Sequence, residues 1–399
     1  MTTAPTASSG SSARATVAPS TPVGPSILIS CGGTGGHLSP GIALAEGLRG
    51  RGYAVTLLIS EKKIDARLVE KYPHFEFVRI AGAPLAWSPR PLARFVSSQL
   101  RGLAFSRRLI RERRPVAIVG FGGFTSASIL LAGAMAGVPV ALHEANRVPG
   151  KAVRVMGRLA KRVYLPPGVG LPQAKPGIVR PAGLPVRAEI RRYPAAEARA
   201  AMGLRPEGKV VVVLGGSQGA SSLNTWARTA APALAAAGVQ LYCVTGPGKG
   251  DGTTEQLPGP NGDMLPVIFS PFCDRMAELM SAADLVVSRA GAGTIAELVR
   301  CETPAVLVPY PFAADDHQAA NAAYFVEHGG GVAVDDAVVA GITPQVLTLL
   351  ADDAALAAYR QSLRRLEQAD ALGTVLDDLE RLINPSEPPR EAVGRAQTA

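Results

Sequence analysis

The pattern that most constrains this chain is a unit of apolar strand, glycine-rich turn, helix and second apolar strand. It occurs in both halves, about 180 residues apart. The turns are Cys-Gly-Gly-Thr-Gly-Gly-His at 31–37 and Gly-Gly-Ser-Gln-Gly-Ala at 215–220. The elements predicted around them are strand 26–30, helix 39–49 and strand 54–60, then strand 210–214, a helix containing Trp226 and strand 239–245. Alternating strands and helices imply parallel sheets covered on both faces.

Each half contains a second unit of the same kind. Strands 116–120 and 285–288 run into glycine turns at 120–123 and 289–294, and each is followed by a helix and a further strand. The repeated order predicts an α/β fold with two similar domains. Ligands of such sheets bind at the carboxyl ends of the strands, which would place the site in a cleft between the domains.

The domain boundary is predicted near Pro181–Pro185, where proline and glycine cluster. We expect a first domain over 26–184 and a second over 185–365, with a C-terminal helix at about 366–384 returning to the first. The segments 1–25 and 385–399 are predicted to be disordered tails, and the first has no apolar stretch typical of a secretory signal.

A run of 28 residues without a charge, 115–142, is long enough to span a bilayer. Glycine turns at 120–123 and 137–139 interrupt it, so we interpret it as strand, turn, helix and strand in a buried core. The four cysteines, Cys31, Cys243, Cys273 and Cys301, form no C-x-x-C pair. This disfavours a disulfide framework or a cysteine-rich zinc site and favours a reducing compartment.

Neither glycine turn in the first pair of units fits the G-x-G-x-x-G dinucleotide pattern, and Gly-Pro-Gly-Lys-Gly at 246–250 lacks the hydroxyl residue of a phosphate-binding P-loop. Each turn still places small residues before a helix N-terminus, where free amides favour a phosphate. The alternative is a plain tight turn. Two such turns, one in each half, favour a phosphorylated ligand.

Three groups of polar residues have both a chemical and a structural interpretation. His37 ends the first turn, where an imidazole could accept a proton from a hydroxyl, although a lone histidine is often structural. Glu297 lies one turn into the helix after 289–294 and could bind a ribose diol or simply offset the helix dipole. Asp315-Asp316-His317-Gln318 could hold a metal, but direct hydrogen bonding to a sugar is favoured, since no other His or Cys cluster supports a metal site.

The net charge of +9 is concentrated in one segment. Residues 84–114 contain eight arginines and one glutamate, together with leucines and aromatics. Such a segment is typical of binding to an anionic membrane surface, and the alternative is a solvated helix face. Nucleic acid is disfavoured because the chain has no recognised nucleic-acid-binding motif.

Seven segments in this order resemble the MurG family of peptidoglycan N-acetylglucosaminyltransferases, over about residues 26–384. They are GGTGGHLSPGIALAEGL at 32–48, GFGGFTS at 120–126, HEAN at 143–146, GLPVR at 183–187, GGSQGASSLN at 215–224, SRAGAGTIAEL at 288–298 and DDHQAANA at 315–322. The chain departs from the family in two places, with Ala145 where glutamine is common and Thr125–Ser128 where Gly-Pro is common.

The resemblance implies two Rossmann-like domains facing across a deep cleft, the fold called GT-B. It implies inverting transfer of N-acetylglucosamine from its UDP conjugate to the C4 hydroxyl of undecaprenyl-pyrophosphoryl-N-acetylmuramyl-pentapeptide, at the cytoplasmic face of the membrane. This reaction belongs to cell-wall biogenesis, on which cell shape and division depend. No cofactor is implied, and no D-x-D motif is present to hold a metal at the diphosphate.

The resemblance also implies roles for individual residues. His37 is the candidate base, and Thr34, Gly35 and Gly36 would line the acceptor diphosphate side. The donor would contact the second domain and its neighbours through Arg187 and the backbone of Cys273 at uracil, Ser217 at the diphosphate, Ala292, Gly293 and Thr294 at phosphate and sugar, Glu297 at ribose, and Gln318 with Asn146 at the sugar hydroxyls.

Two other functions remain as alternatives at this point. A UDP-N-acetylglucosamine 2-epimerase of similar fold would need no membrane-binding segment, so residues 84–114 argue against it. A membrane-surface protein with a vestigial nucleotide site would fail to bind UDP.

Overall fold

The computed structural model describes residues 24–32, 35–60, 64–80, 89–123, 126–250, 252–367, 370–388 and 390. Nearly all of the first predicted tail, residues 1–23, lies outside this part, and so does 391–399 in the second. At the start of the second predicted tail, the Arg390 amide donates to Glu380 Oε2 at 2.7 Å.

The first domain is a parallel seven-stranded sheet with the order β3-β2-β1-β4-β5-β6-β7. Its strands are β1 (Ser26–Ser30), β2 (Ala54–Ile59), β3 (Glu76–Arg79), β4 (Ala117–Gly120), β5 (Val140–His143), β6 (Arg162–Leu165) and β7 (Val179–Pro181). Its helices are α1 (Gly35–Gly50), α2 (Ile64–Lys71), α3 (Pro89–Arg113), α4 (Ser126–Met135) and α5 (Lys151–Met156).

The second domain repeats this plan, with the strand order β10-β11-β9-β8-β12-β13-β14. Its strands are β8 (Lys209–Leu214), β9 (Val239–Val244), β10 (Thr253–Pro258), β11 (Met264–Ser270), β12 (Leu285–Ser288), β13 (Ala305–Leu307) and β14 (Gly331–Ala333). Its helices are α6 (Ala195–Ala201), α7 (Ser221–Ala236), α8 (Met276–Ala282), α9 (Ala292–Arg300), α10 (His317–Glu327), α11 (Thr343–Ala351) and α12 (Asp353–Glu367), with 3₁₀ turns η1 (Ala314–Asp316) and η2 (Asp336–Gly341).

The α/β fold with two parallel sheets is confirmed, with two local differences. The edge strand β10 pairs antiparallel with β11, and its mostly exposed polar residues give no buried-strand signal in the sequence. Helix α1 begins at Gly35 and not near Ser39. Pro40 is typical of a first turn, but here Gly35 and Gly36 add a turn before it.

The two faces of each sheet are packed by different helices, following the period of two along the strands. In the first domain Ile27 and Ile29 of β1 pack with α1, while Leu28 packs with α3, α4 and α5 on the other face. The uncharged run 115–142 contains β4, α4 and β5, with both strands and one face of α4 in the core. Among the described helices, none is both long and apolar enough to cross a membrane.

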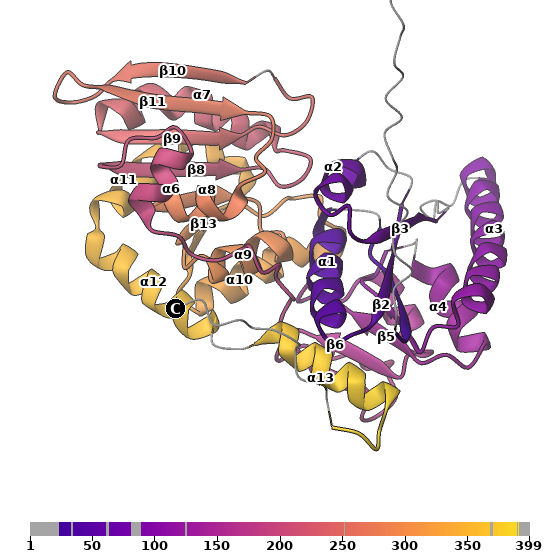
Figure 1. Ribbon diagram of the computed structural model, residues 1–399. Helices are drawn as coiled ribbons and strands as arrows, with labels where there is room; N and C mark the ends of the chain where they lie inside the picture. The colour runs from indigo at the N-terminus through magenta and orange to yellow at the C-terminus, as the bar shows by residue number, and fades with distance from the viewer. Residues whose placement is uncertain are drawn as a thin grey trace, which may run out of the picture.

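The chain crosses between the domains twice. The segment 182–194 leads from β7 into the second domain, and after α12 the chain returns to place α13 (Ala371–Ile383) against α1 of the first domain (Figure 1). Two sets of polar contacts fix α13 there. Arg51 pairs with Asp377 and Glu380, and Asp378 accepts hydrogen bonds from Arg162 and Tyr164.

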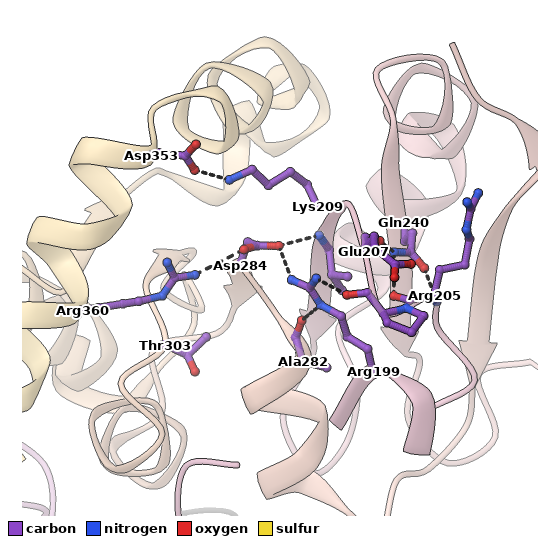
Figure 2. Close-up of polar contacts among 12 residues, drawn as sticks. Arg199, Arg205, Glu207, Lys209, Gln240, Ala282, Asp284, Thr303, Asp353 and Arg360 are labelled. Atoms are coloured by element: carbon purple, nitrogen blue, oxygen red, sulfur yellow. Dashed lines mark hydrogen bonds and ion pairs between the residues drawn. The ribbon is translucent and has the colours of Figure 1, made fainter. Parts of the chain in front are cut away.

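At the amino ends of β8 and β12, a buried carboxylate joins four elements of the second domain (Figure 2). Asp284 Oδ2 accepts hydrogen bonds from Arg199 Nη2 of α6 at 2.8 Å and from the Val210 amide at 2.9 Å. Its Oδ1 faces Arg360 Nη2 of α12 at 3.4 Å. These contacts tie α6 and α12 to the sheet, at the end opposite the glycine turns.

Candidate active site

The strand orders bring the four glycine turns to equivalent places. In the first sheet β1 lies beside β4, and in the second β8 lies beside β12. In each sheet the helices that follow these two strands pack on opposite faces, so a crevice is expected at their carboxyl ends. The turns after β1, β4, β8 and β12 are the four glycine segments that stand out in the sequence.

The two domains meet at this level. Helix α1, which follows β1, contacts α9, which follows β12 (Figure 1). The Arg147 amide of the first domain donates to Asn321 Oδ1 of α10 at 3.0 Å. Arg154 of α5 forms an ion pair with Asp315. These contacts bring α1 and α9, the helices that follow the glycine turns after β1 and β12, together at the domain interface.

His37 lies in the first turn of α1 and is half-buried. Its ring lies against the turn after β4, since a Cβ at Gly123 would come within 3.5 Å of His37 Cε1. Gly123 has a φ of +77°, which other residues adopt only with strain. The first-domain turns therefore hold the imidazole at the carboxyl ends of β1 and β4. Gly35 and Gly36 are the first residues of α1, and Thr34 lies outside the described residues.

The N-terminus of α9 is open to a ligand. Gly291 caps the helix without a side-chain hydrogen bond, and the first-turn amides of Ala292, Gly293 and Thr294 have no partner within the helix. A Cβ built at Gly293 would meet nothing within 4 Å, so the space beside this turn is free. Free amides and the helix dipole together favour a phosphate at this position.

Arg187 and Glu297 form a buried pair close to α9. Arg187 Nη2 lies 3.6 Å from Glu297 Oε1, and burial raises the pKa of Glu297 although Arg187 opposes the shift. The Nε of Arg187 is buried and has no hydrogen-bond partner among the described residues. An unpaired buried donor of this kind is a group that a bound ligand can satisfy.

Ser217 and Cys273, two further residues predicted from the sequence, lie where strands of the second sheet end. Ser217 is exposed in the turn after β8. Gly219 closes that turn, and a Cβ there would come within 2.0 Å of the Thr245 carbonyl oxygen. Cys273 follows β11, and burial raises its thiol pKa.

Asn146 belongs to the first domain and Gln318 to the second. Asn321, which is on the same helix as Gln318, forms a hydrogen bond with Asn146. Asn321 Nδ2 donates to Asn146 Oδ1 at 3.1 Å and to the Ala290 carbonyl at 3.2 Å. Glu144 Oε1 accepts from the amide and the Nδ2 of Asn146, both at 2.9 Å. Gln318 Oε1 accepts from the Tyr310 amide at 2.9 Å, so Nε2 is the end of the side chain that could donate to a ligand.

The sequence left open a metal site at Asp315-Asp316-His317, and the structure gives two of these side chains other partners. The Asp315 carboxylate is paired with Arg154 across the domain interface, and His317 Nδ1 lies 2.7 Å from the Ala314 carbonyl oxygen. Within the described parts of the chain, no three His, Cys, Asp or Glu side chains are grouped to hold a metal ion.

Comparison with known proteins identifies the family. Residues 27–165 match the glycosyltransferase family 28 N-terminal domain, and residues 210–373 match the family 28 C-terminal domain. The chain belongs to glycosyltransferase family 28. The two matches coincide with the two sheets that carry the glycine turns.

Full-length relatives agree with this family. The chain is 58% identical over 355 residues to a UDP-N-acetylglucosamine–N-acetylmuramyl-(pentapeptide) pyrophosphoryl-undecaprenol N-acetylglucosamine transferase of Opitutus terrae, covering 89% of this chain and 94% of the relative. It is 38% identical to the protein of the same name from Streptomyces avermitilis, covering 82% and 90%. The resemblance to the MurG family is therefore confirmed.

Solved structures support the fold. The structure of MurG from Acinetobacter baumannii aligns with a TM-score of 0.65 at 24% identity, over 90% of this chain and 99% of that one. A putative UDP-N-acetylglucosamine 2-epimerase from Listeria monocytogenes aligns with a TM-score of 0.62 at 12% identity, over 92% and 99%. At these identities both alignments speak for the architecture alone.

The structure places both departures from the usual family 28 transferase pattern. Ser126 and Ser128 lie in α4 and are buried. Ser126 Oγ donates to the Gly122 carbonyl at 2.7 Å and lies 3.0 Å from Ser30 Oγ. Ser126 therefore supports the turn after β4 from the core. Ala145 is half-buried between Glu144 and Asn146, and Thr125 lies outside the described residues.

Several residues of this family 28 site carry no assigned role in the sequence analysis. Asn321 lies in the same sequence segment as Gln318, and Glu144 in the same segment as Asn146. This proximity in sequence could have indicated that they belong to the site. Arg289 also lies in a motif, and it donates to Asp336 and to Ser222. Tyr72, Glu189 and Arg147 lie outside the motifs or at their margins, and only the folded chain brings them to the interface.

Proposed function

We propose that this chain transfers N-acetylglucosamine from UDP-N-acetylglucosamine to the C4 hydroxyl of undecaprenyl-pyrophosphoryl-N-acetylmuramyl-pentapeptide, with inversion at the anomeric carbon. The observation that carries the proposal is that α1 and α9, which follow glycine turns in the two family 28 domains, contact each other at the domain interface. The identity to named transferases over nearly the full chain supports the choice of donor and acceptor. This reaction would place the chain in cell-wall biogenesis, and hence in cell shape and division.

The donor is proposed to bind the second domain. The open first turn of α9 would receive the diphosphate at Ala292–Thr294, with Ser217 on the other side. Glu297 would accept hydrogen bonds from the ribose hydroxyls. Arg187 and the backbone of Cys273 would meet the uracil, and the unpaired Nε of Arg187 supports a ligand there. Gln318 and Asn146 would contact the sugar hydroxyls.

The acceptor is proposed to bind the first domain, with its diphosphate near Thr34, Gly35 and Gly36. His37 would accept the proton of the C4 hydroxyl as that oxygen attacks the anomeric carbon. The bond from the anomeric carbon to the diphosphate oxygen breaks in the same displacement, and UDP leaves with the additional negative charge. The amides at the N-terminus of α9 would stabilise that charge as it develops.

No resident cofactor is part of this proposal. Its support is the donor set at the diphosphate, which consists of backbone amides and a helix dipole and can bind an anion directly. UDP-N-acetylglucosamine is a substrate. Adding a chelator to the purified protein and measuring transfer would test whether a divalent cation contributes.

We further propose that α3 and α4 rest on an anionic membrane at the cytoplasmic face. Figure 1 shows α3 at the margin of the first domain, away from the second. Exposed apolar side chains, Val96, Leu100, Phe105, Leu131 and Met135, accompany four exposed arginines, Arg107, Arg108, Arg111 and Arg114. Apolar insertion combined with arginine attraction to acidic headgroups binds a protein to a membrane surface. Residues 84–88 of the predicted segment lie outside the described part.

The activity is tested with purified protein, labelled UDP-N-acetylglucosamine and a lipid-linked muramyl-pentapeptide acceptor. We expect label to move to the lipid, and only when acceptor is present. Epimerised sugar formed without acceptor would support the epimerase alternative. Absence of UDP binding by calorimetry would support a vestigial nucleotide site.

The membrane contact is tested by changing Arg107, Arg108, Arg111 and Arg114 to Gln. Binding to vesicles that contain anionic lipid should weaken by at least about tenfold, since each arginine near such a surface contributes about 1 kcal/mol. Affinity for UDP should not change. The matched control changes Arg191, Arg205, Arg364 and Arg365, which are exposed on the second domain. Equal vesicle binding by both variants would mean that α3 is a solvated helix face and not a membrane-binding surface.

A further inference from the structure

Arg187 forms a hydrogen bond with Tyr72, a first-domain residue that lies outside the seven segments that resemble the MurG family. Its Nη1 donates to the hydroxyl of Tyr72 at 3.1 Å and to Glu189 Oε1 at 3.0 Å. The Tyr72 hydroxyl in turn donates to the same Glu189 oxygen. Tyr72 directly follows α2 and packs in the core of the first domain, whereas Arg187 and Glu189 lie on the segment leading into the second.

We propose that Tyr72 is a positioning residue for donor binding, because its hydroxyl fixes the direction in which Arg187 points toward Glu297 and the nucleotide. The inference rests on the proposed function, in which Arg187 and Glu297 bind the uridine part of the donor. It adds a residue of the first domain to a nucleotide site that otherwise belongs to the second domain and its connecting segment.

The geometry supports this role in two ways. A guanidinium on a long side chain has many rotamers, and ordering it costs conformational entropy. Tyr72 is 5% exposed and its ring is packed, so its hydroxyl is a fixed point. That hydroxyl accepts from Arg187 and donates to Glu189, so both of its hydrogen-bonding capacities are used in orienting the arginine. Burial, together with the bond to Glu189, raises the pKa of Tyr72, so the hydroxyl keeps its proton.

The surrounding charges make the hydroxyl hard to replace. Three carboxylates, Glu46, Glu189 and Glu297, share this region with Arg187 and Lys71. Without the Tyr72 hydroxyl, Glu189 keeps Arg187 and Lys71 as partners, so the arginine is drawn toward Glu189. The loss should therefore fall on the contact with Glu297 and the nucleotide, and not on the fold as a whole.

The test is Tyr72→Phe, with Tyr164→Phe as matched control. Tyr164 is also a buried first-domain tyrosine whose hydroxyl meets a carboxylate, Asp378, at 3.1 Å, but it lies against α13. For Tyr72→Phe we expect the KM for UDP-N-acetylglucosamine and the Kd for UDP to rise about tenfold, as for loss of a hydrogen bond to a charged group. The kcat should stay within about twofold, because the nucleotide is held equally in ground and transition states.

A double-mutant cycle separates positioning from a general structural effect. If Tyr72 acts through Arg187, then adding Tyr72→Phe to Arg187→Ala should cause no further loss of UDP affinity. Melting temperatures of the two phenylalanine variants check that both remain folded. Equal donor KM in Tyr72→Phe and Tyr164→Phe, or full additivity in the cycle, would overturn the inference. Failure of the wild-type chain to bind UDP would instead refute the proposed function, and the inference with it.

Discussion

The two ends of the second sheet differ in whether particular polar groups find hydrogen-bond partners within the protein. At the amino ends of β8 and β12, Asp284 engages Arg199, Arg360 and the Val210 amide. The nearby Gln240 accepts from the Arg205 amide and donates to two carbonyls. At the carboxyl ends, the first turn of α9 has no side-chain cap, and the buried Nε of Arg187 has no partner in the described structure.

This difference separates the residues that stabilise the domain from those that bind. Buried polar groups satisfied within the protein contribute to folding, whereas donors left unpaired cost stability until a ligand satisfies them. In this sheet the Asp284 network lies at the amino ends of β8 and β12, whereas the uncapped first turn of α9 and the unpaired Nε of Arg187 lie toward the carboxyl end of β12. Variants at the two ends should change different measurements, which allows the comparison to be tested.

The largest effect is expected from Asp284→Ala at the amino end. Removing one member of a buried charge network leaves Arg199 without its anion, which costs about 3 kcal/mol in the free energy of unfolding. The affinity of the folded protein for UDP should not change. Urea denaturation and calorimetry measure the two quantities. Asp353→Ala is the control, since its ion pair with Lys209 lies at the same end (Figure 2) but is exposed, and little change is expected there.

A loss of UDP affinity in folded Asp284→Ala would contradict the division of roles between the two ends. So would a fall in stability for Asp353→Ala as large as that for Asp284→Ala, because an exposed pair would then matter as much as the buried network.

At the carboxyl ends of the first sheet, on the other side of the domain interface, His37→Ala should have the converse effect. We expect kcat to fall by at least about tenfold, the low side of general-base contributions, while the melting temperature moves by no more than a few degrees. His328→Ala is the control. That histidine lies at the far end of α10, and its Nδ1 contacts the Tyr324 carbonyl oxygen at 2.8 Å. Wild-type turnover in His37→Ala would show that the imidazole is not the catalytic base.

Much of this arrangement could be predicted from local sequence. The strands around both glycine turns, the repetition of the unit and the division of 115–142 into strand, helix and strand all follow from apolar runs broken by glycine. Because each turn follows a strand in a parallel sheet, the sequence also predicted that the turns would gather at the carboxyl ends. The start of α1 was misplaced, since Ser39-Pro40 is a good helix start and the glycines before it have low helix propensity.

The contacts between distant segments could not be predicted in this way. Tyr72 looks like any core aromatic, and its pairing with Arg187 joins residues 115 positions apart. Asp284 and Arg199 meet only once α6 packs against the second sheet, and Asn321 and Asn146 meet only once the two domains contact each other. Strand β10 is mostly polar and exposed, and it exists because β11 offers an edge with which it pairs.

The smallest expected effect concerns Glu297, where stability and binding should respond to pH in opposite directions. Burial raises the pKa of this carboxyl, opposed by Arg187 and reinforced by Glu189. The folded state therefore binds the Glu297 proton more tightly than the unfolded state, so this group's contribution to stability is present at low pH. It is lost as pH rises through the raised pKa.

Ribose hydroxyls need the ionised carboxylate as acceptor, so affinity for UDP should increase by a few-fold as pH rises through the same window. Calorimetry over a series of pH values, from the ordinary carboxyl range upward, measures this change. Glu297→Gln keeps the shape but does not titrate, so its weaker UDP binding should not vary with pH in that window. If the variant kept the wild-type pH dependence, the titrating group would be another carboxyl with a raised pKa, such as Glu46, and Glu297 would not be the group that binds the ribose.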